Sequence, residues 1–145
     1  MIEIYTDGSC GAGEGKGGWA FVVFKDGRYI EGNYKGYPSV TIGWLEVQAM
    51  YQALCYCRDR KLTATIYSDS QYVVSSVNEW FYKWEQNDWK RRDGKEISHK
   101  ILMQAMSLVW KEVCSHVQVK WIKGHNGTFG NTMADDMAKM AKATA

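Results

Sequence analysis

The stretch Ile2-Glu3-Ile4-Tyr5-Thr6-Asp7 reads as a β-strand that ends on a carboxylate, and the architecture of the chain follows from it. A second stretch, Thr65-Ile66-Tyr67-Ser68-Asp69, has the same form and also ends on an aspartate. In open sheets with helical crossovers, the functional crevice lies beyond the carboxyl ends of the strands. We therefore expect Asp7 and Asp69 to face the same rim of one sheet.

The segments around these two strands predict a mixed sheet. Asp26-Gly27 is a strong hairpin turn between strands at residues 18–25 and 28–35, so the first three strands should pair antiparallel. A helix at about residues 41–58 leads to the strand at 64–68, and a last strand is expected at 117–122. Further helices are predicted to begin at Asp69-Ser70, to cover residues 80–87, to start after a Ser98 cap, and to run from an Asn131 cap to Lys142. The predicted fold class is α/β, with a five-stranded mixed sheet flanked by helices.

The bulk composition is that of one globular domain, expected to span residues 1–145. Apolar runs such as residues 19–24 are too short to cross a bilayer, and the N-terminus lacks the order of a signal peptide, so a cytoplasmic protein with no membrane partner is expected. A net charge of +2 is too small to indicate a nucleic-acid partner by itself. The cysteines lack zinc-site spacing, which favours reduced thiols at Cys10, Cys55, Cys57 and Cys114.

Two further acids, Glu46 and Asp135, lie inside predicted helices. Glu46 heads an otherwise apolar stripe at helical spacing, which continues through Met50, Ala53, Leu54 and Cys57. A carboxylate directed toward a sheet is strongly unfavourable unless a cation compensates it. Because no lysine or arginine shares the stripe, a divalent metal ion is a natural partner for Glu46.

Each acid also has an ordinary structural interpretation. Asp7 is followed by glycine, which is a turn signal, and the other three acids lie where a carboxylate favours the dipole of a helix start. Asp136, beside Asp135, leaves the choice between those two open. The four acids together favour a shared site, because two Mg²⁺ ions about 4 Å apart can activate water and stabilise the leaving oxygen in phosphodiester cleavage. Without ions, four grouped carboxylates would raise one another's pKa values.

The chain resembles the type 1 ribonuclease H family, in its small bacterial form, across nearly its whole length. The matching stretches are Ile4–Cys10 with Gly17-Gly18, Glu46 and its helix, Ser68–Val73, Trp80–Lys90, Trp121–Asn126, and Asn131 with Asp135. The resemblance implies that two Mg²⁺ ions, which Mn²⁺ can replace, are bound by Asp7, Glu46, Asp69 and Asp135, with Asp135 preferred over Asp136. It also implies that His125, on the loop before the last helix, assists water positioning or product release, since a histidine can relay a proton near neutrality.

A basic, tryptophan-rich segment suggests how nucleic acid is held. Residues 80–100 carry six basic side chains against four acidic ones, and Lys90, Arg91 and Arg92 concentrate the charge. Trp80 and Trp84 are four residues apart, so a core-facing position stays open for Trp84. The family uses such a segment to grip the DNA strand of a hybrid. The nucleic-acid-binding residues that the resemblance implies are Cys10, Gly13, Thr41, Gln71, Trp80, Trp84, Lys90, Arg91, Arg92 and His99.

Several recognition positions depart from the family pattern. Side-chain amides that contact the minor groove are replaced by Gly13, Ile42 and Gly43. In the pocket for a DNA phosphate, Thr41 is kept, whereas the other two positions are taken by Val74 and His99. We expect the cutting chemistry to be intact, and the departures bear on substrate discrimination.

The leading hypothesis is a monomeric, metal-dependent endonuclease that cleaves the RNA strand of RNA/DNA hybrids and leaves 5′-phosphate and 3′-hydroxyl ends, as the family does. A related nuclease acting on double-stranded RNA or branched DNA is a second interpretation, because the groove contacts are altered. A non-catalytic nucleic-acid-binding module is a third, which the retention of all four carboxylates disfavours.

Overall fold

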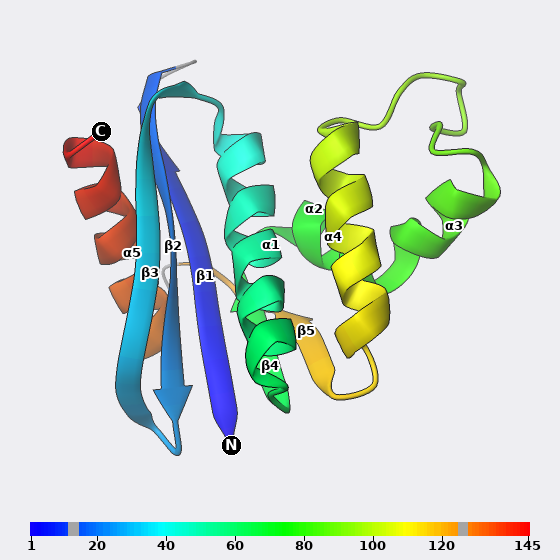
Figure 1. Cartoon of the computed structure of the whole chain (residues 1–145). Coiled ribbons are helices and arrows are strands. Elements are labelled where there is room, and N and C mark those ends of the chain that lie inside the picture. The colour runs from blue at the N-terminus through cyan, green and yellow to red at the C-terminus, as the bar shows by residue number, and fades with distance from the viewer. Residues whose placement is uncertain (12–14, 125–127) are drawn as a thin grey trace.

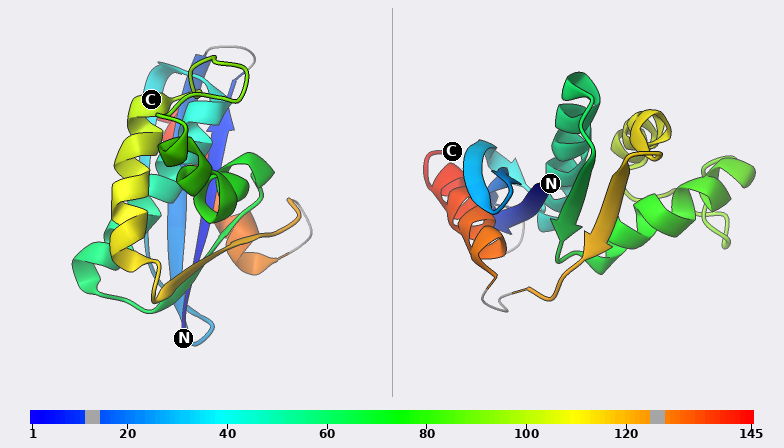
Figure 2. Two further views of the ribbon diagram at one scale, coloured as in Figure 1. Left: turned by 90° about the vertical axis from the view of Figure 1, so that its right-hand side faces the viewer. Right: turned by 90° about the horizontal axis from the view of Figure 1, so that it is seen from below.

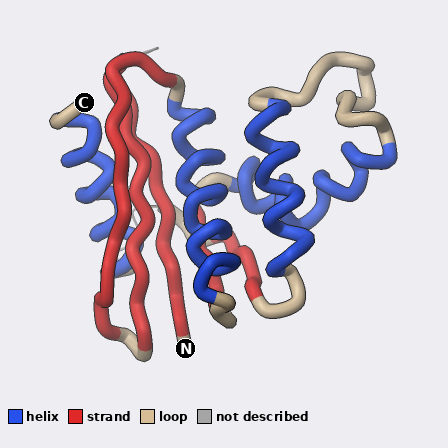
Figure 3. The backbone as a smooth tube through the Cα atoms, in the orientation of Figure 1, coloured by secondary structure: helices blue, strands red, loops and turns tan. Residues whose placement is uncertain are grey.

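The computed structural model describes residues 1–11, 15–124 and 128–145, which form one sheet with helices on both faces (Figure 1). The strands are β1 (Ile2–Cys10), β2 (Gly15–Lys25), β3 (Arg28–Val40), β4 (Ala64–Ser68) and β5 (Val117–Trp121). The helical segments are α1 (Ile42–Arg60), α2 (Gln71–Ser75), η1 (Ser76–Trp80), α3 (Phe81–Gln86), α4 (Lys100–Val113) and α5 (Phe129–Ala143). Figure 3 distinguishes the strands from the helices around them.

The strands form a five-stranded mixed sheet in the order β3-β2-β1-β4-β5. The first three strands pair antiparallel, and β4 pairs parallel with both β1 and β5. The predicted α/β class and the antiparallel start of the sheet are therefore confirmed. Asp26 and Gly27 have positive φ angles of 51° and 81°, as a two-residue hairpin turn requires when its twist matches that of its strands.

The register of β1 against β4 brings the two aspartates to the same level of the sheet. The parallel ladder ends at the pair Tyr5 and Tyr67, and Asp7 and Asp69 each follow two residues later. The expectation that the first strand ends at Asp7 is wrong, because its antiparallel ladder with β2 continues to Cys10. Asp7 is therefore held within a paired strand on one side, while the parallel half of the sheet ends beside it.

Helices cover the two faces of the sheet differently (Figures 1 and 2). α5 packs on β1, β2 and β3, whereas α1 packs on the opposite face and is itself contacted by α4. Leu45, Val47, Ala49 and Met50 of α1 have no exposed surface. A helix buried on several sides is apolar around most of its circumference. The core therefore surrounds α1, and it includes the apolar helical stripe predicted to follow Glu46.

Two glycines let α5 approach the sheet closely. A Cβ at Gly18 would lie 2.7 Å from both the Ala141 Cβ and the Lys142 backbone nitrogen. A Cβ at Gly36 would overlap the carbonyl of Ala141. These positions tolerate no side chain, so they set the distance between α5 and the strands.

Two predicted helix caps are wrong. α4 begins after His99, which has a left-handed backbone with φ of 55°, so Ser98 does not cap it. α5 begins after Thr128, and Asn131 lies buried inside its first turn. Ser98 and Asn131 both lie close to a helix start, but the residues at the N-cap positions are His99 and Thr128.

The segment after β4 forms one uninterrupted helical path rather than the two separate helices predicted. α2, η1 and α3 follow one another without a break, and η1 is a turn of π-helix. Ser70 caps this path as predicted, because its hydroxyl accepts a hydrogen bond of 3.3 Å from the Val73 backbone N–H. None of the described helices is both long enough and apolar enough to cross a membrane.

Candidate active site

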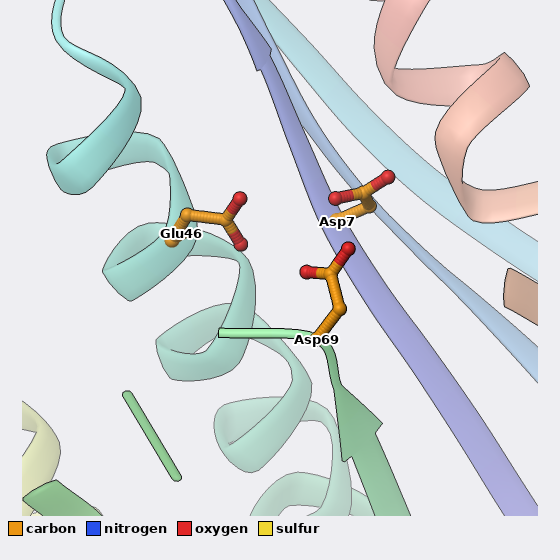
Figure 4. A group of neighbouring side chains, drawn as sticks. All are labelled: Asp7, Glu46 and Asp69. Atoms are coloured by element: carbon orange, nitrogen blue, oxygen red, sulfur yellow. The ribbon is translucent and has the colours of Figure 1, made fainter. Parts of the chain in front are cut away.

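Three of the four predicted acids meet at one point. Asp7 comes from β1, Glu46 from α1, and Asp69 from the residue that follows β4. Figure 4 shows their carboxylates turned toward one another, and one oxygen from each lies within 4.8 Å of the others. Residues far apart in the chain thus form a single cluster at the level where the parallel ladder ends.

The burial of this cluster makes its negative charge costly. Asp7 is only 5% exposed, and burial, followed by the charge of Asp69, raises its pKa from the usual 3.8 to about 8. The Gly8 backbone N–H donates a 2.9 Å hydrogen bond to Asp7 Oδ1, which opposes this shift without cancelling it. Burial, followed by the charges of Asp7 and Asp69, also raises the pKa of Glu46 well above its ordinary value. The cluster therefore favours either protons or a bound cation.

Glu46 supplies the sharpest sign that a ligand belongs here. Its Oε2 atom is buried and has no hydrogen-bond partner among the described residues. A buried, unsatisfied carboxylate oxygen is strongly unfavourable in a stable fold. Hard oxygen ligands converging on one point are what Mg²⁺ and similar cations prefer, so the three acids fit a divalent metal ion.

The fourth acid, Asp135, reaches the cluster from α5. A hydrogen bond between the side chains of Asp135 and Asp7 contributes to the raised pKa of Asp7. Asp135 Oδ2 also forms a 2.9 Å ion pair with Lys139 Nζ, one helical turn further along. Asp136 is exposed on the same helix. The geometry therefore favours Asp135 over Asp136 as the acid that joins the cluster.

The last residue of β5 and the chain that follows it contact Asp69. Trp121 Nε1 donates a 3.0 Å hydrogen bond to the Asp69 carbonyl. A Cβ at Gly124 would lie 2.8 Å from Asp69 Oδ2, so any larger residue there would require the carboxylate or the chain to shift. The sequence alone indicates no role for Trp121 or Gly124. The spacing of Asp135 and Lys139 could have been noticed as a helical ion pair, but the contacts of Trp121 and Gly124 depend on the tertiary fold.

Comparison with known proteins identifies the family. A family model described as RNase H matches residues 1–143. The chain belongs to the ribonuclease H family. It is 32% identical over 139 residues to Ribonuclease HI of Haemophilus ducreyi, covering 96% of this chain and 88% of that protein. It is 36% identical over 144 residues to Ribonuclease H of Francisella tularensis subsp. novicida, covering 98% and 91%. The protein is therefore a ribonuclease H enzyme.

Solved structures agree on the ribonuclease H fold. The foamy viral protease-reverse transcriptase in complex with RNA/DNA hybrid superposes with a TM-score of 0.88 at 21% identity, over 99% of this chain and 20% of that one. LC11-RNase H1 in complex with RNA/DNA hybrid superposes with a TM-score of 0.74 at 20% identity, over 99% of this chain and 98% of that one. At this level of identity the likeness shows the common fold.

The tryptophans and the basic run predicted to bind nucleic acid come together beside α2 and α3. They line one open pocket of about 790 Å³, to which Trp80, Trp84, Lys90, Arg91 and Arg92 all contribute. Trp84 also packs against the core, as the core-facing interpretation expects, and its contact with nucleic acid stays a prediction. Gln71 is exposed at the start of α2, next to this region.

The other predicted contact residues lie elsewhere. Thr41 caps α1 by accepting a 3.4 Å hydrogen bond from the Trp44 backbone N–H. A Cβ at Gly43 would lie 3.3 Å from His99 Nε2, so the starts of α1 and α4 lie next to each other. Burial lowers the pKa of His99. The Cys10 thiol donates to the Val40 carbonyl at 3.2 Å. The two remaining predicted residues, Gly13 and His125, lie outside the described residues.

Proposed function

We propose that the enzyme hydrolyses the RNA strand of RNA/DNA hybrids with two divalent metal ions held by Asp7, Glu46, Asp69 and Asp135. The products would carry 5′-phosphate and 3′-hydroxyl ends. The observation that carries the proposal is the meeting of three carboxylates, together with a Glu46 Oε2 that is buried and has no hydrogen-bond partner among the described residues. Mg²⁺ is the proposed ion, with Mn²⁺ as a substitute, because the donor set is entirely carboxylate oxygen.

The chain's own contribution is to hold these acids in place before substrate arrives. Glu46 is carried by a helix enclosed in the core, and Asp7 by a strand paired on both sides. Trp121 and Gly124 hold and accommodate Asp69. Bound divalent ions would lower the pKa of an attacking water and stabilise the leaving oxygen of the phosphodiester. A rigid cluster spends little free energy on rearrangement when that charge develops.

Two observations support an RNA/DNA hybrid as the proposed substrate: the complexes solved for structural neighbours and the positive charge of the pocket beside α3. The foamy viral protein and LC11-RNase H1 described above were each solved with an RNA/DNA hybrid, which supports a hybrid as the substrate here. The cationic pocket beside α3 would contact the phosphates of the bound strand. We further propose that residues 1–145 act as one ribonuclease H domain, since the sheet joins strands from both halves of the chain, and that the enzyme works as a monomer.

Cleavage of matched substrates tests the proposal. A hybrid, an RNA duplex, a DNA duplex and a branched DNA of equal length would be incubated with the enzyme at one salt concentration, with Mg²⁺ or with EDTA. We expect Mg²⁺-dependent cleavage of the RNA strand of the hybrid. Ligation of the product fragments should depend on the 5′-phosphate that cleavage leaves on them. Faster cleavage of the RNA duplex or branched DNA would transfer the substrate assignment to that molecule. Cleavage in EDTA would contradict the role of the metal ions.

A further inference from the structure

The open pocket beside α3 is lined by both cationic and aromatic side chains. The phosphates of a duplex would contact the cationic side chains but would leave the aromatic rings without a stacking partner. It has a volume of about 790 Å³, and its aromatic lining comes from Tyr72, Trp80 and Trp84. Its cationic lining comes from Lys83, Lys90, Arg91 and Arg92. Among the described residues that line the pocket, none is acidic. The combination of positive charge and aromatic rings indicates a ligand that is both anionic and aromatic.

Most of the pocket's cations are available to such a ligand. Arg91 forms a 3.3 Å ion pair with Asp93, whereas the structure records no ion pair of Lys83, Lys90 or Arg92 within the described ranges. Glu85, the nearest acid on α3, pairs at 3.0 Å with Lys111 of α4. Asp93 therefore compensates Arg91, and Glu85 is engaged away from the pocket, whereas Lys83, Lys90 and Arg92 keep their charge available within the described ranges.

The loop that carries the cations is fixed before any ligand binds. The Asn87 amide donates hydrogen bonds to the carbonyls of Lys90 at 2.9 Å and Arg91 at 3.3 Å. The Arg91 backbone N–H donates to the Lys95 carbonyl at 2.7 Å. A preorganised loop loses little conformational entropy when it binds phosphate groups.

The aromatic residues form a continuous ladder along one side of the pocket. The Tyr72 and Trp80 rings meet edge to face at 5.6 Å, and the Trp80 and Trp84 rings lie 5.7 Å apart. Tyr72 is 38% exposed, so part of its ring is open to a ligand. Bases inside a duplex are stacked on each other and present mainly phosphates and groove edges, whereas unpaired bases offer whole faces for stacking.

We propose that this pocket binds unpaired nucleotides that continue a strand beyond the hybrid, so that the enzyme prefers hybrids with a single-stranded extension to blunt ones. The inference deepens the proposed function and rests on it for the identity of the duplex. The phosphates of the extension contact the cationic loop, and one or more bases stack on Tyr72 and Trp80. Tyr72 lies only three residues after Asp69, so the aromatic lining of the pocket begins next to the acid cluster along the chain.

Binding without cleavage tests this inference. Dissociation constants would be measured by fluorescence anisotropy in EDTA, at fixed ionic strength, for a blunt hybrid and for hybrids with a DNA, an RNA or an abasic extension. We expect a DNA or RNA extension to tighten binding by roughly tenfold for each stacked base, and an abasic extension to give a smaller gain. Comparison of the DNA and RNA arms identifies which strand the pocket prefers. Equal affinity for blunt and extended hybrids, or an abasic extension that gives the whole gain, would overturn the inference.

Matched variants separate stacking from general attraction. Tyr72→Ala should remove the gain from the bases and weaken binding of the extended hybrids more than binding of the blunt hybrid, while Tyr82→Ala, at a 72% exposed tyrosine outside the pocket, should change neither. Lys83→Gln should reduce the gain from all three extensions and lower its salt dependence. If a polyglutamate peptide bound more tightly than the extension and required Tyr72, the pocket would belong to an acidic protein partner.

The inference and the proposed function fail in different ways. Cleavage of a blunt hybrid with no benefit from an extension would contradict only the inference. Tight, Tyr72-dependent binding of an extension by an enzyme that leaves the hybrid uncut would contradict only the proposed function.

Discussion

The charge of Asp7 is unfavourable for the folded protein in the absence of cations, although we propose that it is required for activity. Asp7→Asn keeps the shape and the hydrogen bond from Gly8 but removes a buried charge. We expect the variant to unfold in EDTA at pH 8 with a free energy at least about 1 kcal/mol higher than the parent, since one pKa unit corresponds to about 1.4 kcal/mol. Cleavage of the hybrid should fall by more than about a hundredfold.

Asp136→Asn is the matched control for this variant, because Asp136 is an exposed acid beside Asp135. It should change neither stability nor turnover by a measurable amount. Normal turnover in Asp7→Asn, with folding verified by circular dichroism, would refute the assignment of Asp7 to the metal site.

Gly124 tests whether the approach of the chain to Asp69 matters. In Gly124→Ala the new Cβ would lie 2.8 Å from Asp69 Oδ2, which forces the carboxylate or the chain to move. We expect at least about a tenfold loss of cleavage, because small misplacements of reacting groups are costly, with little change in thermal stability. Gly11→Ala is the control, since its Cβ would meet no atom of the described residues closer than 3.8 Å. Equal losses in the two variants would show that crowding at Asp69 is not the cause.

Site residues could be predicted from the sequence where a local pattern, such as helical spacing, marks them. Residues whose role depends on tertiary contacts could not be predicted in this way. Glu46 could be recognised because a carboxylate heads an apolar helical stripe, and the structure brings it beside Asp7 and Asp69. Trp121 offered no comparable signal, because its hydrogen bond to Asp69 joins residues 52 positions apart. Such a contact is fixed only once β4 and β5 are paired.

Among the elements, α5 has the most demanding position, because it must lie close to the sheet while delivering Asp135. Gly18→Ala would place a Cβ 2.7 Å from the Lys142 backbone nitrogen and 2.8 Å from the Ala138 carbonyl, neither of which can yield without moving the helix. We expect a loss of about 1–3 kcal/mol in unfolding free energy, measured in urea. Hybrid cleavage should fall as well, since Asp135 moves with α5. Lys16→Ala, at an exposed position in the same strand, should leave both unchanged.

Element boundaries were the part of the fold that sequence could not define. The first strand was expected to end at Asp7, yet its antiparallel partner β2 extends the ladder to Cys10. Asn131 was a reasonable cap by residue type, but α5 starts two residues earlier, at Phe129, and buries Asn131. Strand pairing and helix docking decide these ends, whereas the hairpin at Asp26-Gly27 was predictable because its backbone angles are set by the turn residues themselves.

Taken as a whole, the molecule assembles its acid cluster from parts that meet only after folding. Asp7, Glu46, Asp69 and Asp135 belong to the central strand, the buried helix, the end of the neighbouring strand and the helix on the opposite face. An unfolded chain therefore has no preformed site for a cation. Any ion held by these acids stabilises the folded state by an amount that rises with the logarithm of its concentration relative to its dissociation constant.

This coupling predicts how stability depends on pH and metal. The folded-state pKa of Asp7 is about 8 and its ordinary value is 3.8, so the folded protein retains a proton that the unfolded chain releases between these values. In EDTA, the contribution of Asp7 to the unfolding free energy should therefore be greatest below about pH 4 and fall as the pH rises toward 8, with Glu46 acting in the same direction. Asp7→Asn should make this decline shallower.

Mg²⁺ should reverse the loss, because cations favour the ionised acids that high pH produces. At about a hundredfold excess over its dissociation constant, a single bound ion would add about 2.7 kcal/mol. Urea unfolding at several pH values, with Mg²⁺ and with EDTA, measures both effects. An unfolding free energy in EDTA that stays constant between pH 4 and 8, or a Mg²⁺ gain that is equal at both ends, would mean that the acids are not the coupled, cation-binding group inferred from their burial.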